Sequence, residues 1–375
     1  MIQKVSFLNF KAYRSLDLEL EPFTVLVGLN ASGKTTLLRG LEIISNLEVI
    51  AIHDGFEAIT RISPDVRSHG SNQPVEIQVS GEWGGTKGTF YATSTKTLPE
   101  GKGPDEGDVN GREFKVTGKW ERVPSLEVFR MALRSTKVLR FDPQRLADAS
   151  YSEDITPSVQ HDGRGLASAL AHLKLSRDEI FDQIELALKQ VVPAVRRIRI
   201  ERAAVEQTTM RTLALDEQKH LLPEKRTLWG QKIVFDMKGA KGVPADMAGE
   251  GTLMTLGLLT VLMGPTHPRL VLLDDIEMGL HPSAQGQLIQ VLREIQARDP
   301  GVQIIATSHS PFILNYLDPK EVRLTALAEN GFARCEKMTA HPQFERWKDL
   351  MSPGEFWSSI GESWVEKAAE TTSHE

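Results

Sequence analysis

The sequence predicts an α/β fold with a mixed, mainly parallel sheet and flanking helices, and two patterns lead to this prediction. The first is the apolar run FTVLV at residues 23–27, which is followed by the glycine-rich loop 28–35 and then by apolar residues at helical spacing. The second is the alternation of helix-like and strand-like segments after residue 248, which is typical of parallel strands joined by crossover helices. A run that is apolar at nearly every position, without alternation, indicates a strand buried on both faces.

Three consecutive segments are expected along the chain. Residues 1–150 would form an N-terminal lobe with the glycine-rich loop and a small antiparallel β subdomain, because VEIQVSGEW and GTFYATS read as strands between loops rich in Gly, Pro and charge. Residues 151–225 would form a helical insertion and a linking strand, and residues 226–375 a C-terminal lobe. The loop at 99–113 has the composition of a disordered segment.

The composition excludes several classes of protein. The formal net charge of the 375 residues is −6 at pH 7, which argues against a chain that coats nucleic acid through bulk charge and leaves a local basic patch open. The single cysteine, Cys335, excludes an internal disulfide framework and a four-cysteine zinc site. Because the sequence has no long apolar run and no signal-like N-terminus, we expect a soluble, cytoplasmic protein with no membrane partner.

The loop GLNASGKT at residues 28–35 matches the pattern G-x-x-x-x-G-K-[ST] and lies between a buried strand and a helix, where phosphate-binding loops occur. Its glycines let backbone N–H groups turn towards phosphate oxygens, and the helix N-terminus adds partial positive charge. We expect Lys34 to neutralise the β- and γ-phosphates and Thr35 to offer its hydroxyl to Mg²⁺. The predicted nucleotide-binding residues of this segment are Gly28, Asn30, Ala31, Ser32, Gly33, Lys34, Thr35 and Thr36.

Three carboxylates follow the apolar segment RLVLL within four positions, namely Asp274, Asp275 and Glu277. Carboxylates this close repel one another unless a cation or a reaction uses them. In folds with a phosphate loop, a neighbouring strand ends in an aspartate that holds Mg²⁺, and Asp274 has this position. Glu277 lies beyond the strand, where it is equally well explained as a solvated side chain.

A further apolar strand, IIATSHS, ends in a histidine, His309. In open α/β sheets, ligands bind outside the carboxyl ends of the strands. We therefore expect His309 to contact the γ-phosphate.

These motifs, in this order, resemble those of ATP-binding-cassette ATPases, and more closely those of prokaryotic stand-alone AAA family ATPases of the SMC, RecF and OLD-like group. The resemblance rests on VSFLNFKAYRSLDLEL, GLNASGKTT, DGRGLASAL, GEGTLMTLGLL, DDIEMGLHP and ATSHSPFIL, which together span most of the chain. It implies the ABC-type ATPase head rather than the ring-forming AAA+ fold. It also implies ATP and Mg²⁺ as cofactors and ATP hydrolysis as the activity.

The resemblance further implies an ATP-promoted homodimer in which the signature segment of one head touches the γ-phosphate bound to the other. The matching signature here is Gly249, Glu250, Gly251 and Thr252, at the start of a helix. The family has a serine where this chain has Gly249, so one hydroxyl donor to the phosphate is missing. Gln144 matches the glutamine that contacts magnesium.

The resemblance leaves two candidates for the general base. The position after the metal-binding aspartate usually carries a glutamate that orients the attacking water, and here it is Asp275, one methylene shorter. Glu277 is the alternative, since strand alternation places residues 275 and 277 on the same side. The segment after Glu277 matches the family's crossing to the partner head, so we favour Asp275.

By resemblance, the protein is expected to act as a DNA-handling or DNA-sensing switch in anti-phage defence or DNA repair. About 66 residues follow His309, too few for the Toprim nuclease of OLD-like proteins, so a nuclease or effector would be a separate chain. The alternatives are a transporter ATPase subunit and an ATP-binding scaffold with little hydrolysis. The basic strand at 196–202 places Arg197 and Arg199 on one face, which either contacts DNA or is simply solvated.

Overall fold

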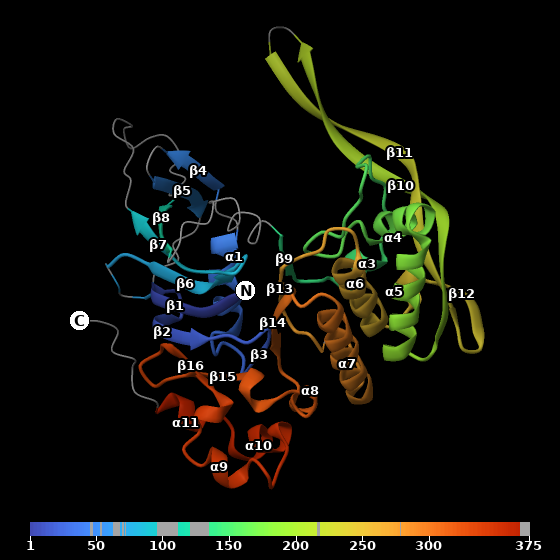
Figure 1. The fold of residues 1–375 in the computed structure, drawn as a ribbon. Coiled ribbons are helices and arrows are strands. Elements are labelled where there is room, and N and C mark those ends of the chain that lie inside the picture. The colour runs from blue at the N-terminus through green and yellow to red at the C-terminus, as the bar shows by residue number, and fades with distance from the viewer. Residues whose placement is uncertain are drawn as a thin grey trace. The chain divides into compact units, whose positions relative to one another are not determined.

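The chain divides into two compact units in the computed structural model shown in Figure 1. The structure describes residues 1–367, except 46–47, 53–54, 63–67, 70, 72, 96–111, 121–134, 216–217 and 278. Unit 1 comprises Met1–Val138, Pro268–Glu277 and Gln296–Glu375, and unit 2 comprises Leu139–His267 and Met278–Ile295. These units differ from the three consecutive segments that we expected, because the chain leaves unit 1 and returns to it twice. Most of the segment 99–113 lies outside the described residues.

Unit 1 contains two sheets. The first has seven strands in the order β2-β1-β6-β7-β8-β5-β4, and its described pairings are all antiparallel. Its strands are β1 (Ile2–Phe10), β2 (Tyr13–Glu19), β4 (Glu48–Ile52), β5 (Gly55–Ile62), β6 (Glu76–Trp83), β7 (Thr86–Thr95) and β8 (Arg112–Trp120). The expected antiparallel subdomain is thus part of a larger sheet that also contains the opening strands of the chain.

The second sheet has six strands in the order β16-β15-β3-β14-β13-β9. Strand β14 is parallel to both β3 and β13, β15 is parallel to β3, and β16 is antiparallel to β15. Its strands are β3 (Phe23–Val27), β9 (Thr136–Leu139), β13 (Leu270–Leu273), β14 (Gln303–Ser308), β15 (Val322–Leu327) and β16 (Ala333–Lys337). The prediction of a mixed, mainly parallel sheet is confirmed.

A shared apolar core holds these two sheets and helix α1 (Lys34–Ser45) together. The five residues of β3 are almost completely buried, as a run that is apolar except for Thr24 predicts for a strand in the middle of a sheet. The remaining helices of unit 1 are short: α8 (Pro311–Leu314), η2 (Pro319–Glu321), η3 (Met338–Ala340), α9 (Phe344–Trp347), α10 (Pro353–Ile360) and α11 (Ser363–Glu366). In this tail, buried Trp347 stacks on Phe356 with 3.6 Å between ring centroids, so it is a packing residue.

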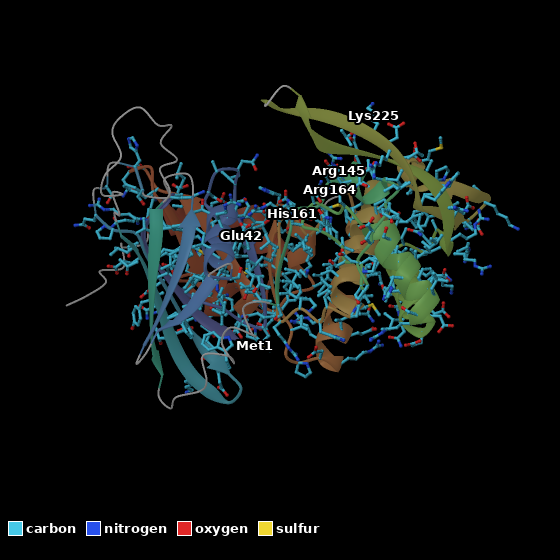
Figure 2. All side chains as sticks on the ribbon, turned by 90° about the horizontal axis from the view of Figure 1, so that it is seen from above. Met1, Glu42, Arg145, His161, Arg164 and Lys225 are labelled. Carbon is cyan, nitrogen blue, oxygen red and sulfur yellow. The ribbon has the colours of Figure 1, made fainter. Side chains whose placement is uncertain are left out.

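Unit 2 combines helices with a three-stranded sheet in the order β10-β11-β12. Its elements are α3 (Pro143–Ala147), α4 (Leu166–Ser176), α5 (Asp178–Val191), β10 (Val195–Leu215), β11 (Gln218–Met237), β12 (Ala240–Pro244), η1 (Ala245–Met247), α6 (Glu250–Met263) and most of α7 (Pro282–Arg298). Strands β10 and β11 pair with each other from Val195 and Met237 to Leu215 and Gln218, forming a long ribbon (Figures 1 and 2). Helices α4 and α5 pack against the base of this ribbon.

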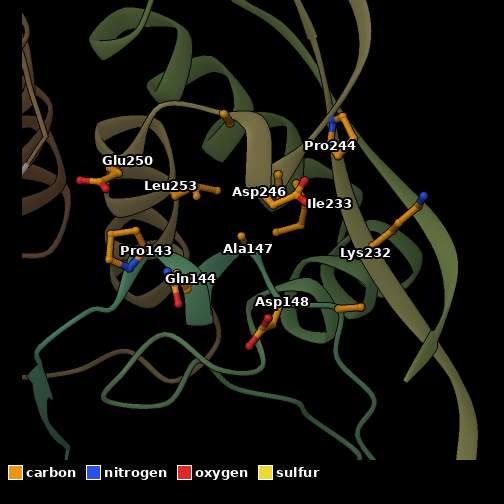
Figure 3. A pocket seen from close by; sticks show the side chains of 13 residues that line it. Pro143, Gln144, Ala147, Asp148, Lys232, Ile233, Pro244, Asp246, Glu250 and Leu253 are labelled. Carbon is orange, nitrogen blue, oxygen red and sulfur yellow. The ribbon is translucent and has the colours of Figure 1, made fainter. Parts of the chain in front are cut away.

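A pocket of about 740 Å³ lies in unit 2 between α3, the start of α6 and the base of the ribbon (Figure 3). Gln144 and Glu250 both line it. None of the described helices is long and apolar enough to cross a membrane.

Candidate nucleotide-binding site

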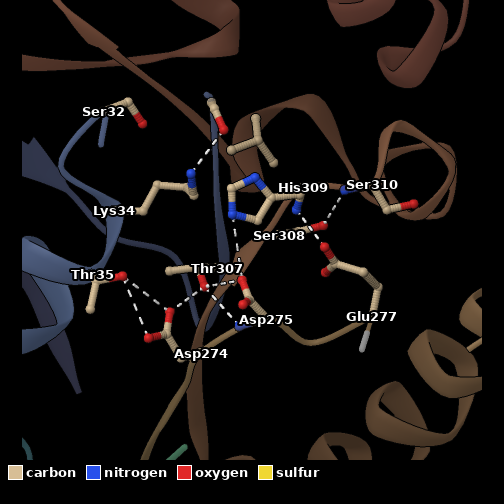
Figure 4. Close-up of polar contacts among 12 residues, drawn as sticks. Ser32, Lys34, Thr35, Asp274, Asp275, Glu277, Thr307, Ser308, His309 and Ser310 are labelled. Carbon is tan, nitrogen blue, oxygen red and sulfur yellow. Dashed lines mark hydrogen bonds and ion pairs between the residues drawn. The ribbon is translucent and has the colours of Figure 1, made fainter. Parts of the chain in front are cut away.

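The site forms where strands β3, β13 and β14 of unit 1 end (Figure 4). The register aligns these ends, because Ser308 of β14 pairs with Val27, the last residue of β3, and Ala306 pairs with Leu273, the last residue of β13. The loop after each strand therefore begins at nearly the same level. This parallel register brings together the glycine-rich loop, the acidic segment and His309, which are far apart in the sequence.

The glycine-rich loop needs glycine at both of its ends. Gly28 has φ +149° and Gly33 has φ +102°, a region that side chains disfavour. A Cβ on Gly28 would lie 2.1 Å from the carbonyl oxygen of Thr325, and one on Gly33 would lie 2.7 Å from Ala333 Cβ. The loop is further tied to β15 by a 2.5 Å hydrogen bond between the hydroxyls of Ser32 and Thr325.

Lys34 lies inside this loop. Its ammonium Nζ donates hydrogen bonds to the carbonyl oxygens of Gly28 (2.8 Å) and Leu29 (2.9 Å). Burial lowers the pKa of Lys34 below its usual value, and the nearby carboxylates of Asp275, Asp274 and Glu277 oppose this shift. An ammonium has three N–H donors, so one remains for a phosphate oxygen while the other two hold the loop.

Asp274 and Thr35, the two predicted magnesium ligands of this edge, face each other. Thr35 Oγ1 lies 3.4 and 3.5 Å from the two carboxylate oxygens of Asp274. Hydroxyl and carboxylate oxygens are the hard ligands that Mg²⁺ prefers, and Mg²⁺ is usually held by one or two protein oxygens together with phosphates and water. The pair fits such an ion, and the described residues contain no group of three or more metal-ligating side chains that would form a closed protein site.

Thr307, at the end of β14, connects the two aspartates. Its hydroxyl donates to Asp274 Oδ1 at 2.7 Å and accepts a hydrogen bond from the backbone N–H of Asp275 at 2.8 Å. Asp275 has φ +54°, a left-handed conformation that is unusual for a residue other than glycine. Thr307 is completely buried, and no role for it was predicted from the sequence. The available signal was a hydroxyl residue at the end of an apolar strand, directly before Ser308 and His309.

The geometry separates Asp275 from Glu277. Asp275 Oδ1 lies 3.6 Å from His309 Nε2, and both side chains are about 40% exposed, 39% for Asp275 and 40% for His309. Glu277 Oε1 instead accepts a hydrogen bond of 2.5 Å from the backbone N–H of His309. Glu277 therefore anchors the loop that carries His309, whereas Asp275 presents its carboxylate beside the imidazole.

The expected signature and Gln144 belong to unit 2. Gly249 precedes helix α6 in an extended conformation, and a Cβ there would meet only Thr252 Oγ1, at 3.9 Å. Gly251 is packed closely, since a Cβ on it would lie 2.4 Å from the carbonyl oxygen of Gly279. The structure brings Gln144 and Glu250 to one pocket, and the assigned roles of these unit 2 residues stay predictions.

Comparison with known proteins agrees with this geometry. Residues 135–315 match the family described as "AAA domain, putative AbiEii toxin, Type IV TA system", and residues 1–81 match "AAA ATPase domain". An OLD nuclease of Thermus scotoductus is 24% identical over 331 residues, which cover 83% of this chain. The chain spans 59% of that relative's length.

Two solved structures share the fold. One is the SmcHead bound to the C-winged helix domain of ScpA, with TM-score 0.55 and 13% identity, covering 92% of this chain and 99% of that one. The other is an Smc head domain with an extended coiled coil bound to the C-terminal domain of ScpA derived from Pyrococcus furiosus, with TM-score 0.52 and 13% identity, covering 93% and 99%.

Proposed function

Because the chain is a prokaryotic ABC/SMC-like AAA ATPase of OLD type, we propose that it binds ATP with Mg²⁺ and hydrolyses it as a switch. The observation that carries this proposal is the cluster of Lys34, Thr35, Asp274, Asp275 and His309 at one sheet edge. A bound Mg²⁺ would neutralise charge on the β- and γ-phosphates, with Thr35 and Asp274 as its protein ligands.

The chain's own residues supply the remaining chemistry. Lys34 offers its third N–H to the terminal phosphates while its other two donors keep the loop closed. Asp275 takes the proton of the attacking water, and His309 beside it contacts the γ-phosphate. Glu277 positions His309 through the backbone N–H of that histidine.

The relatives support a proposal for the biological role. We propose that ATP promotes dimerisation and that Gly249–Thr252 of one chain complete the site of the other. The dimer would then handle or sense DNA and act on a separate nuclease or effector chain. The relationship to an OLD nuclease, of which this chain spans 59%, supports the DNA-handling part. A role in anti-phage defence or DNA repair is the corresponding cellular proposal.

Lys34→Ala tests the ATPase. We expect hydrolysis to fall by roughly 10²–10³-fold and ATP binding to weaken strongly, because the site loses its buried cation. The matched control is Arg39→Ala, which removes an exposed cation of the same helix. Isothermal titration that gives unchanged ATP affinity for Lys34→Ala would refute the assignment of the loop.

The thermal stability of Lys34→Ala in the absence of nucleotide can also be predicted. Because burial lowers the pKa of Lys34, the folded state binds this proton less readily than the unfolded chain, so the protonated side chain costs stability at neutral pH. Loss of the Lys34 charge should therefore not lower the melting temperature of nucleotide-free Lys34→Ala. The increase that ATP produces in the parent protein should be absent.

A further inference from the structure

Helix α8 follows the strand end that carries His309. It begins at Pro311, directly after its N-cap residue Ser310, so a single residue separates His309 from the helix. Ile313 and Leu314 of α8 are completely buried, and a helix of this length is not stable by itself. The contacts that fix α8 therefore also fix the backbone from which the imidazole of His309 projects.

Helix α10, from the C-terminal part of the chain, packs closely against α8 (Figure 1). A Cβ on Gly354, in the first turn of α10, would lie 2.2 Å from the carbonyl oxygen of Pro311 and 2.4 Å from Asn315 Oδ1. Any side chain at Gly354 would thus force the two helices apart. The backbone N–H of Gly354 also donates a 2.9 Å hydrogen bond to Asn315 Oδ1. The first turn of α10 therefore holds α8 at Pro311, where α8 begins, and at Asn315, its C-cap.

The C-terminal segment in turn fixes α10. A capping box that begins at Ser352 closes the N-terminus of the helix. Phe356 is completely buried and stacks on Trp347, and the indole Nε1 of Trp357 donates a 3.1 Å hydrogen bond to Glu362 Oε2. Aromatic stacking and these hydrogen bonds make α10 a firm support for α8.

The backbone at His309 is held from the other side by residues of the site. Glu277 Oε1 accepts a 2.5 Å hydrogen bond from the N–H of His309, and the N–H of Ser310 donates to Ser308 Oγ at 3.0 Å. The His309 side chain itself is 40% exposed and can reach a ligand. A fixed backbone with an accessible side chain is the arrangement that holds a functional group in a productive position.

We propose that Gly354 and Asn315 are positioning residues for His309, and that α10 acts through them to set the place at which the imidazole meets the γ-phosphate. The proposal rests on the contact between His309 and the γ-phosphate in the proposed function. It extends the nucleotide site to a part of the chain beyond residue 315, which neither family match reaches. Because His309 would touch only the terminal phosphate, α10 should affect the binding of ATP and not that of ADP.

Isothermal titration of the full chain with ATP and with ADP, together with steady-state hydrolysis, tests this assignment. For Gly354→Ala, which displaces α8, we expect both kcat and the ratio of ATP affinity to ADP affinity to fall roughly tenfold, with ADP affinity unchanged. Asn315 is exposed, so Asn315→Ala tests the same contact without threatening the fold, and both quantities should fall about threefold. Asn315→Asp keeps an oxygen acceptor for the N–H of Gly354 and should recover most of this loss.

Val365→Ala is the matched control for stability. Val365 is completely buried in α11, which belongs to the same C-terminal segment and packs against β15 and β16. The substitution should lower the melting temperature, because buried apolar atoms are lost, and leave kcat and the ratio of the two affinities unchanged.

A double variant decides whether α10 acts through His309. His309→Ala should itself lower kcat and the ratio of affinities, and adding Gly354→Ala to it should lower the ratio no further. Two outcomes would overturn the positioning role and leave the proposed function standing: fully additive losses, or Gly354→Ala and Asn315→Ala proteins that lose only melting temperature, as Val365→Ala does. A His309→Ala protein with the parent's kcat and ratio would instead refute the γ-phosphate contact, and the positioning role with it.

Discussion

At the scale of single residues, the structure distinguishes the two candidates for the general base, Asp275 and Glu277. Asp275 faces His309, whereas one oxygen of Glu277 is already bound to the backbone N–H of His309. We expect Asp275→Asn to lower turnover by roughly 10²–10⁴-fold with ATP binding retained, because the proposed general base is lost. Glu277→Gln keeps an oxygen acceptor for His309 and should cost less than about tenfold. Steady-state hydrolysis rates in the reverse order would transfer the role of base to Glu277.

Thr307 gives a second prediction at this scale. Thr307→Val keeps the shape of the side chain but leaves the N–H of Asp275 without its acceptor and removes the hydrogen bond to Asp274. We expect turnover to fall about tenfold or more and half-saturation to need more Mg²⁺, since the proposed magnesium ligand Asp274 loses a hydrogen bond that positions it. Thr307→Ser, which restores the hydroxyl, should recover most of both. A Thr307→Val protein that loses only melting temperature, with an unchanged Mg²⁺ requirement, would make Thr307 purely structural.

At the scale of elements, the start of helix α6 carries a prediction of its own. A side chain at Gly249 would enter open space, unlike one at Gly251, which would collide with Gly279. Gly249→Ser should therefore fold normally and supply the hydroxyl that the family's signature has. We expect ATP-promoted dimerisation to strengthen severalfold, as one added hydrogen bond would give. Gly249→Ala is the control, and equal effects of Ala and Ser would exclude a role for the hydroxyl.

The sequence predicts an element well when the apolar pattern of that element alone indicates whether it is a helix or a strand and which of its faces are buried. The buried strand β3 and helices α1 and α6 follow from apolar runs and spacing, and the site at the sheet edge follows from the motifs that end these strands. Of the ribbon, only the basic strand at 196–202 was predicted, because the outer residues are largely polar and form strands by pairing with each other. Thr307 could not be assigned from sequence, since its role depends on a parallel register that places it beside a segment over 30 residues away.

At the scale of the whole molecule, the candidate residues are divided between the two units. Unit 1 holds the glycine-rich loop, Asp274 and His309, whereas unit 2 holds the predicted signature at Gly249–Thr252. If the signature acts on the nucleotide of a second copy, each site is shared between two chains in a two-fold dimer. The parent protein should then be monomeric without ATP, and Asp275→Asn should double in mass with ATP, as measured by light scattering. An identical mass with and without ATP would contradict nucleotide-driven association.

Complementation separates a shared site from simple dimerisation. Gly249→Asp introduces a negative charge where the signature would approach the γ-phosphate, at a position with room for a side chain. Neither Lys34→Ala nor Gly249→Asp alone should hydrolyse ATP. In an equal mixture, the mixed dimer pairs an intact loop from one chain with an intact signature from the other, so about a quarter of the parent activity should return if the two sites are independent. A mixture as inactive as its components would show that both motifs must belong to the same chain.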